Sequence, residues 1–166
     1  AINIAREIGD KRNEGNSLGN LGSTYRNLGN YPKAIEYYQL AINIAREIGN
    51  KSSEGMHLGN LGYLYLEQGQ LIDAEAPLRE AISICDDAMP LAAGSFRGSL
   101  ALLLSKQDQL DEAHALLKTG EPQVKSVPQE HAKFLCKKGQ VQLFGSDRHR
   151  KGNSADVAVD NQKQSS

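Results

Sequence analysis

The sequence predicts an all-α protein of stacked antiparallel helix pairs, and three observations carry this prediction. Ala1 to Gly22 reads AINIAREIGDKRNEGNSLGNLG, and most of it recurs forty positions later, from Ala41 to Gly62. Self-similarity at a fixed period of this length is typical of repeat architectures. Apolar residues recur three and four positions apart, which is the spacing of one helix face. Glycines followed by Asn or Asp separate these stretches and suit helix ends.

Residues 1–9 form the first predicted helix, with an apolar stripe at Ile2, Ala5 and Ile8. Gly9 suits the left-handed position that ends a helix, and Asp10 suits the N-cap of the next one. We therefore expect a tight turn here and interpret residues 1–9 as the second helix of a truncated repeat. The first residue is Ala rather than Met, which fits a fragment of a longer chain.

The first complete unit is predicted over residues 10–48, with helices over about 11–28 and 31–48. Gly29 ends the first helix, and Asn30 caps the second. Pro32 falls in a first helical turn, where its missing N–H costs little. The expected apolar stripes are Leu18, Leu21, Gly22, Tyr25 and Leu28, then Ala34, Tyr38, Ala41, Ala45 and Ile48.

The same pattern recurs twice. A second unit is predicted over residues 49–87, with Gly49–Asn50 and Gly69 at its turns. A degenerate third unit is predicted over residues 88–119, where Asp108 stands in place of the turn glycine. The matching apolar positions are Leu58, Leu61, Gly62, Tyr65, Ala74, Leu78 and Ala81, then Leu100, Ala101, Leu104, Ala113 and Leu117.

After Lys118 the pattern loosens, and Gly120, Pro122 and Pro128 predict a loop. A C-terminal capping helix is predicted over residues 128–144. Its expected inward side chains are Ala132, Leu135, Cys136, Val141 and Leu143. Residues 145–166 are polar and lack periodicity, so we expect a disordered tail.

The four glycines of the two LGNLG segments fall inside predicted helices, and each costs about 1 kcal/mol relative to Ala. They are Gly19, Gly22, Gly59 and Gly62. Gly22 and Gly62 share the leucine stripe, so we expect close helix–helix approach at both. Gly19 and Gly59 point elsewhere, and we expect them to form a smooth groove wall.

The recurring positions resemble the signature of the tetratricopeptide repeat family, which spaces a large apolar residue, Leu-Gly, Tyr, Ala, an aromatic and Ala at fixed intervals. The first unit supplies Leu18, Leu21–Gly22, Tyr25, Ala34, Tyr38 and Ala41. The resemblance covers residues 1–118. The period is about 40 instead of about 34, and this longer variant resembles repeats of kinesin light chain, Leu-Gly-Asn-repeat adaptors and bacterial signalling proteins.

The resemblance implies a right-handed superhelix whose first helices line a concave groove for a peptide. Asn20 and Asn60 match the groove asparagines of such repeats, similar to the asparagine ladder of O-GlcNAc transferase. An Asn amide both donates and accepts, so it can pair with a peptide bond. The expected groove residues are Asn16, Asn20, Ser23, Asn27, Met56, Asn60, Tyr63 and Glu67, with Arg26 and Leu66 beside them and Ser95, Leu102 and Lys106 extending the line.

Two alternatives stay open at these positions. Asn20 and Asn60 can be ordinary surface residues, and Tyr25 and Tyr65 suit packing better than ligand contact. The carboxylate-clamp members of the family need Lys or Arg facing the groove from the first helices. Gly19, Gly59 and Gly98 occupy one such place, which argues against chaperone C-terminal tails as ligands.

Composition narrows the function further. The chain has 19 Lys plus Arg against 20 Asp plus Glu, so no overall basic field favours nucleic acid. No apolar run is long enough for a membrane span. Cys85 and Cys136 match no metal spacing, and free thiols fit the cytoplasm. The four histidines are scattered, so we expect no metal, no cofactor and no catalytic site.

We therefore expect a non-catalytic scaffold in the cytoplasm that binds a protein or peptide. One alternative is a sensor or regulatory arm of a larger signalling enzyme or transcription regulator. Another is a self-associating module, because Ile2 and Ile8 on an exposed N-terminal helix suit a homodimer. The basic run at 148–151 is flanked by acidic residues and fits a solvated tail better than a nucleic-acid patch.

Overall fold

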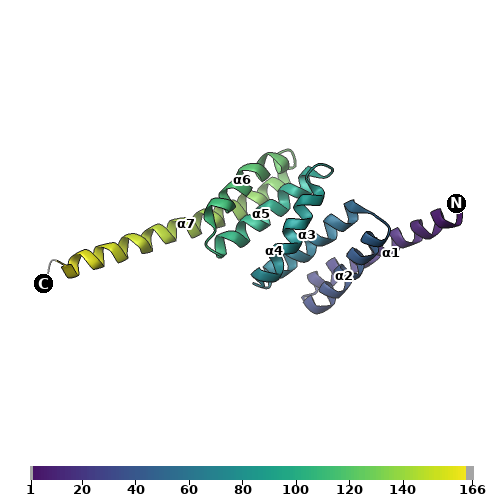
Figure 1. Cartoon of the computed structure of the whole chain (residues 1–166), viewed down its shortest axis with the longest axis horizontal. Helices are drawn as coiled ribbons and strands as arrows, with labels where there is room; N and C mark the ends of the chain where they lie inside the picture. The colour runs from purple at the N-terminus through teal and green to yellow at the C-terminus, as the bar shows by residue number, and fades with distance from the viewer. Residues whose placement is uncertain (1, 164–166) are drawn as a thin grey trace.

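The computed structural model describes the backbone of residues 2–163 and the side chains of residue 7 and residues 9–146. Within that range it consists of seven helices and no strand. They are α1 (Ile2–Asn27), α2 (Tyr31–Glu47), α3 (Lys51–Glu67), α4 (Leu71–Cys85), α5 (Pro90–Lys106), α6 (Leu110–Val124) and α7 (Pro128–Lys163). The molecule is elongated, with the start of α1 at one end and the end of α7 at the other (Figure 1).

Successive helices pack as pairs: α1 with α2, α3 with α4, and α5 with α6. The first helices of the pairs also contact one another in sequence, α1 with α3 and α3 with α5, and α7 joins this layer by packing on α5. The second helices α2, α4 and α6 lie on the other side. This arrangement confirms the predicted all-α solenoid. The division into repeat units by residue number stays a prediction.

The Gly–Asn turns form as predicted. Gly29, Gly49 and Gly69 have φ of 73°, 67° and 73°, in the left-handed region that glycine enters without a steric cost. The side chains of Asn30 and Asn50 accept hydrogen bonds from the backbone N–H groups of the following helices, at 3.3 and 3.2 Å. Asp108 takes the same left-handed conformation, with φ of 69°. The third turn therefore survives without its glycine, because Asp tolerates this region better than most residues.

The predicted turn at Gly9–Asp10 is wrong, since α1 runs without a break from Ile2 to Asn27. The identical segment Ala41–Gly49 does end in a turn. There, α2 packs against both α1 and α3, and burial of Ala41 and Ala45 offsets the cost of reversing the chain. The local sequence signal is the same in both copies, so the neighbouring helices decide the outcome.

Two predictions about the C-terminal part are also wrong. α6 continues through Gly120 and Pro122 to Val124, so the connection to α7 is shorter than expected. α7 does not end at 144 and continues to Lys163, where a disordered tail was expected. Residues 145–163 contain no proline, and a docked first half supplies the costly helical nucleus from which they extend. Residues 164–166 lie outside the described range.

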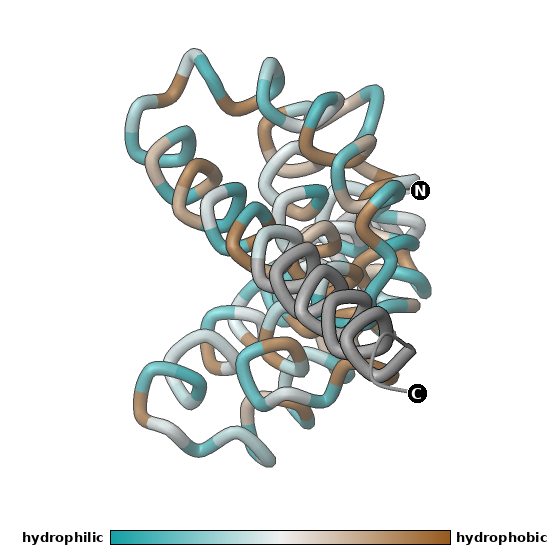
Figure 2. The backbone as a smooth tube through the Cα atoms, turned by 90° about the vertical axis from the view of Figure 1, so that its left-hand side faces the viewer, coloured by the Kyte–Doolittle hydropathy of each residue, from teal (hydrophilic) through white to brown (hydrophobic). Residues whose placement is uncertain are grey.

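Several predicted core positions are exposed. Leu21 on α1 and Leu28 in the turn after it are 41% and 73% exposed, whereas Leu61, the counterpart of Leu21, is 5% exposed. α3 is covered by the preceding α2, but no described helix precedes α1. Ile48 is half-buried. Viewed along the long axis, polar and apolar stretches alternate along every coloured helix, as amphipathic packing requires (Figure 2).

On α7 the buried face is displaced from the predicted one. Ala132, Leu135, Cys136 and Leu143 are exposed, and Phe134 is buried together with Val141, the one predicted residue that is buried. The Phe134 ring rests on two glycines of the preceding pair, Gly98 and Gly120, where an added Cβ would lie 2.8 and 2.9 Å from the ring. This fit sets the rotation of α7 about its axis.

An aromatic ring on a glycine joins each first helix to the next. A Cβ at Gly19, Gly59 or Gly98 would lie 2.1, 2.1 or 2.8 Å from a ring of the following first helix. The rings are those of His57, Phe96 and Phe134. The prediction that Gly19 and Gly59 form a groove wall is therefore wrong, because each is buried between two helices.

Gly22 and Gly62, the other two glycines of the LGNLG segments, allow close approach within the helix pairs, as predicted. A Cβ at Gly22 would lie 2.8 Å from the Tyr38 ring, and one at Gly62 would lie 2.7 Å from Leu78. Both partners belong to the second helix of the same pair and are fully buried. The cost of glycine in these helices is thus offset by close approach of the helices.

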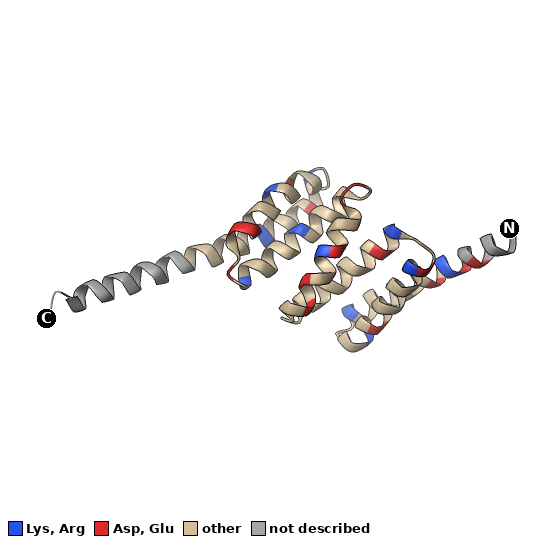
Figure 3. Cartoon of the chain, viewed as in Figure 1, with Lys and Arg blue, Asp and Glu red and all other residues tan. Residues whose placement is uncertain are grey.

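Charged side chains add links between the pairs. Arg97 is buried and donates to both carboxylate oxygens of Asp86, at 2.7 and 2.6 Å, and to Gln123 at 2.7 Å. Buried Glu54 accepts from Arg46 and Lys51, both at 2.7 Å, and these two donors hold its pKa below the usual range against the opposing effect of burial. Elsewhere, positive and negative residues are interspersed along the solenoid (Figure 3).

Substituting Gly59 with Ala tests the ring-on-glycine contact. The new Cβ would overlap the Phe96 ring, and overpacking of this kind costs about 1–3 kcal/mol. We expect the free energy of unfolding in urea to fall, even though Ala favours helix by about 1 kcal/mol. Gly139→Ala on α7 is the matched control, because nothing lies within 4 Å of its added Cβ; it should raise stability. Equal stabilisation by both variants would contradict the contact.

His57 makes the stability depend on pH. Burial lowers its pKa, and neither ring nitrogen has a hydrogen-bond partner among the described residues. Between that lowered pKa and about 6.5, the unfolded chain binds a proton that the folded chain does not, so stability falls as the pH falls through this window. His57→Phe should flatten urea stability between about pH 5 and 7, with His114→Phe, at an exposed position, as the control. An unchanged slope in His57→Phe would sink this assignment.

Candidate functional site

A groove of about 830 Å³ runs along the layer of first helices. α3, α5 and α7 form its walls, and α1 adds one side chain, Arg26. A groove of this size lies within the usual range for ligand sites. The ring-on-glycine contacts position it, because they bring the three helices side by side in one layer.

Apolar side chains form part of the lining. They come from two helices that lie next to each other, α3 and α5: Met56, Leu66, Leu91, Ala92, Phe96 and Leu102. Met56 and Leu91 are both exposed, although each is a large apolar side chain. Exposed apolar surface that is rimmed by polar groups marks an interaction site.

Tyr63 lies at the centre of the groove between two cations. The Arg26 guanidinium carbon is 4.8 Å from its ring centroid, and the Lys137 ammonium is 5.1 Å away, both within cation–π range. Arg26 is held in turn by Glu67, with N–O distances of 2.7 and 3.0 Å. Burial raises the pKa of the Tyr63 hydroxyl, with Glu67 adding to the shift.

Lys137 reaches into the groove from α7. Its ammonium donates to the Ser99 hydroxyl at 2.8 Å and lies 3.5 Å from the Ser95 carbonyl oxygen. Burial lowers its pKa to about 8, while Glu130 opposes the shift. Glu130 is itself engaged by Lys133 at 2.7 Å and by the Ser95 hydroxyl at 3.1 Å. No carboxylate of a described residue lies within ion-pair distance of Lys137.

Asn60 is the one groove asparagine of the described lining. It is half-buried between Met56 and Tyr63 along α3, and no described group hydrogen-bonds its side-chain amide. An amide in this state keeps its donors and its acceptor for a ligand. Ser99, its counterpart on α5, differs because Lys137 already occupies its hydroxyl.

The eight predicted groove residues divide by helix. Those on α3 all line the groove: Met56, Asn60, Tyr63 and Glu67. Those on α1 lie outside its lining: Asn16, Asn20, Ser23 and Asn27. The Ser23 hydroxyl faces the second helix of its own pair, 3.0 Å from the Tyr38 hydroxyl, and Asn16 accepts a long hydrogen bond from Ser53.

The contribution of α7 to the groove is not predicted from the sequence. Glu130, Lys133, Cys136, Lys137 and Gln140 line the groove from this helix. These residues can be assigned to the groove only when Phe134 and Val141, rather than Leu135 and Leu143, are identified as the buried residues of α7. The α5 residues Ser95, Leu102 and Lys106 do lie where the repeat register placed them.

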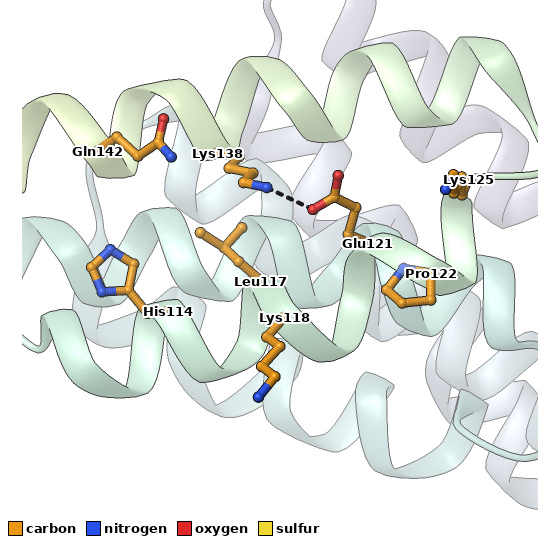
Figure 4. A pocket seen from close by; sticks show the side chains of 8 residues that line it. All are labelled: His114, Leu117, Lys118, Glu121, Pro122, Lys125, Lys138 and Gln142. Atoms are coloured by element: carbon orange, nitrogen blue, oxygen red, sulfur yellow. Dashed lines mark hydrogen bonds and ion pairs between the residues drawn. The ribbon is translucent and has the colours of Figure 1, made fainter.

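A second cavity, of about 430 Å³, lies between α6 and α7 (Figure 4). Its polar side chains include the ion pair of Lys138 with Glu121 at 2.7 Å, with His131 3.6 Å from the same carboxylate. The hydrogen bond from Lys138 holds the pKa of Glu121 below its usual range. This cavity has half the volume of the groove and a smaller apolar lining, and its ion pair ties α7 to α6.

The described residues give little support for metal binding or for a reactive thiol. They contain no group of three His, Cys, Asp or Glu side chains that could hold a metal ion. Cys85 is buried, and burial raises the pKa of its thiol, which makes it a weaker nucleophile. No described helix is apolar over a length sufficient to cross a membrane.

Comparison with known proteins agrees with this architecture. Among solved structures, BtubC (BKLC) from P. vanneervenii is similar, with a TM-score of 0.61 and 17% sequence identity. The match covers 85% of this chain and 63% of that one, so the chain spans less than two thirds of BtubC. At this identity the likeness concerns the fold alone. No curated protein is significantly similar in sequence.

The tetratricopeptide repeat model matches residues 1–47 and 13–87. Together the two matches span residues 1–87, more than half of the 166 residues. They include the predicted signature positions of the first two units. The chain therefore belongs to the tetratricopeptide repeat family.

Proposed function

We propose that this chain is a non-catalytic scaffold that binds a segment of a partner protein in the groove between α3, α5 and α7. Tetratricopeptide repeats generally mediate protein–protein interactions. The observation that carries the proposal is the half-buried Asn60 amide, which has no described hydrogen-bond partner and shares the groove lining with six apolar residues of α3 and α5. The amide can pair with a peptide bond of the ligand, while the apolar residues take apolar side chains.

The groove, rather than the row of asparagines on α1, is the proposed site. Asn20 is exposed on α1 and lies outside the groove lining. Asn60 is half-buried and lines the groove together with Met56 and Tyr63, and a hydrogen bond is worth more in less solvated surroundings. The free thiols Cys85 and Cys136 also fit a reducing compartment, so we place the protein in the cytoplasm.

The alternative functions remain predictions. A homodimer through Ile2 and Ile8 depends on side chains outside the described set. Leu21, which is exposed, lies on the same helix, α1. A sensor or regulatory arm would use the same groove, so the two ideas differ in what the rest of the protein does. Light scattering over a range of concentrations separates self-association from peptide binding.

Three asparagine variants test the groove. Short peptides selected from a random library on the intact chain would be labelled and titrated against each variant by fluorescence anisotropy. Asn60→Ala should weaken binding about fivefold, because a lost neutral hydrogen bond is worth about 1 kcal/mol. Asn20→Ala on α1 and Asn43→Ala, which is exposed on α2, should bind as the original chain does.

The comparison is decisive because each of the three substitutions removes one asparagine side-chain amide, and only the position on the helices differs. If Asn20→Ala weakens binding and Asn60→Ala does not, the ligand lies on α1 and the proposed site is wrong. If none of the three substitutions weakens peptide binding, a fourth variant, Met56→Glu, places a charge among the apolar lining residues. Unchanged binding in that variant would also rule out the groove.

A further inference from the structure

We propose that the groove selects acidic peptides and seats a carboxylate of the ligand on Lys137. This inference rests on the proposed function, since it names the chemistry of the peptide that the groove holds. It goes beyond the sequence prediction, which considered only positive residues on the first helices of the units and found glycines there.

The charges of the lining do not balance. Four cations line the groove, namely Arg26, Lys106, Lys133 and Lys137, against two carboxylates, Glu67 and Glu130. Glu67 is engaged by Arg26, and Glu130 is engaged by Lys133. Lys106 and Lys137 are left without a carboxylate partner among the described residues. The groove is therefore positive, although the whole chain has a net charge of −1.

Lys137 is the cation best placed to bind an anion. Its ammonium has three N–H groups. One is used by the Ser99 hydroxyl at 2.8 Å, and the Ser95 carbonyl at 3.5 Å is only a weak second acceptor. The Tyr63 ring lies on another side at 5.1 Å. A mostly buried charge without a counterion is costly, and a ligand carboxylate would supply the missing one.

The surroundings define the rest of the ligand. The open Asn60 amide lies on α3, and the apolar side chains of Leu66 and Phe96 line the same groove. A peptide that satisfies all of these groups carries Asp or Glu next to large apolar residues. The positive charge comes from α7 and the end of α5. The glycine positions of the first helices cannot contribute, because Gly19, Gly59 and Gly98 are covered by rings.

Binding should also depend on the protonation of Lys137. Its pKa of about 8 is set by burial, with Glu130 and Glu67 favouring the charged form and Lys133 and Arg26 opposing it. A carboxylate ligand favours the charged form, so binding takes up protons near this pH and weakens as the pH rises further. Tyr63 stays neutral here because burial raises its pKa. A Cys136→Ser background removes the thiol that lines the groove. The other charged groups that face Lys137 in the groove are Arg26, Glu67, Lys106, Glu130 and Lys133.

The test uses matched peptides and the intact chain. Peptides selected from a random library would be resynthesised with each Asp or Glu changed to Asn or Gln. We expect the acidic form to bind about tenfold more tightly than the amide form, as for a charge-assisted hydrogen bond. Lys137→Met should abolish this difference, Lys137→Arg should keep it, and Lys138→Met, which removes a neighbouring lysine paired with Glu121, should leave it unchanged. Calorimetry in buffers of different ionisation heat should detect proton uptake near about pH 8 in the original chain and none in Lys137→Met.

Each outcome has one meaning. Equal binding of acidic and amide peptides overturns the carboxylate seat and leaves the proposed function intact. A preference for acid that survives Lys137→Met overturns the assignment to Lys137. Binding that ignores both Lys137 and Asn60 overturns the proposed function as well. Circular dichroism of each variant checks that the helices are retained, and the retained preference in Lys137→Arg shows that α7 is still docked.

Discussion

The contact on which the structure depends is an aromatic ring lying on a helical glycine. Without a Cβ at the glycine, the ring reaches the backbone of the preceding first helix, and the two helices approach closely. The contact occurs three times along the layer, at Gly19 with His57, Gly59 with Phe96, and Gly98 with Phe134. It fixes the separation and the rotation of α1, α3, α5 and α7 together. A Cβ at any of these glycines would push one helix away from the next.

The groove follows from this layer. With the rings packed between neighbouring first helices, α3, α5 and α7 border one hollow, which Phe96 helps to line and which carries Asn60, Tyr63 and Lys137. α7 therefore has two roles that the same contact produces. It covers the apolar end of the solenoid through Phe134, as a capping element must. Because Phe134 sets its rotation, it also directs Lys137 toward Ser99 and Tyr63.

Much of the fold was predictable because it depends on local geometry that recurs. Gly29, Gly49 and Gly69 adopt the left-handed turns that their neighbours indicate. Gly22 and Gly62 mark close approach within the pairs. Gly9 carries the same signal and forms no turn, since the segment before it has no helix on both sides. The site was half predictable for a related reason: the α3 residues follow the repeat register, whereas α7 lacks the repeat and its buried face had to be found from contacts.

By itself, the sequence determined that the protein is helical, that its helices pair, and where most of the reversals fall. Those properties depend on the apolar period, on capping residues and on the conformational freedom of glycine, all of which act over a few residues. Only the tertiary structure decided which glycines meet rings, which face of α7 is buried, and which side chains share the groove. These outcomes depend on how far apart whole helices lie and how each is rotated, and no short stretch of sequence contains that information.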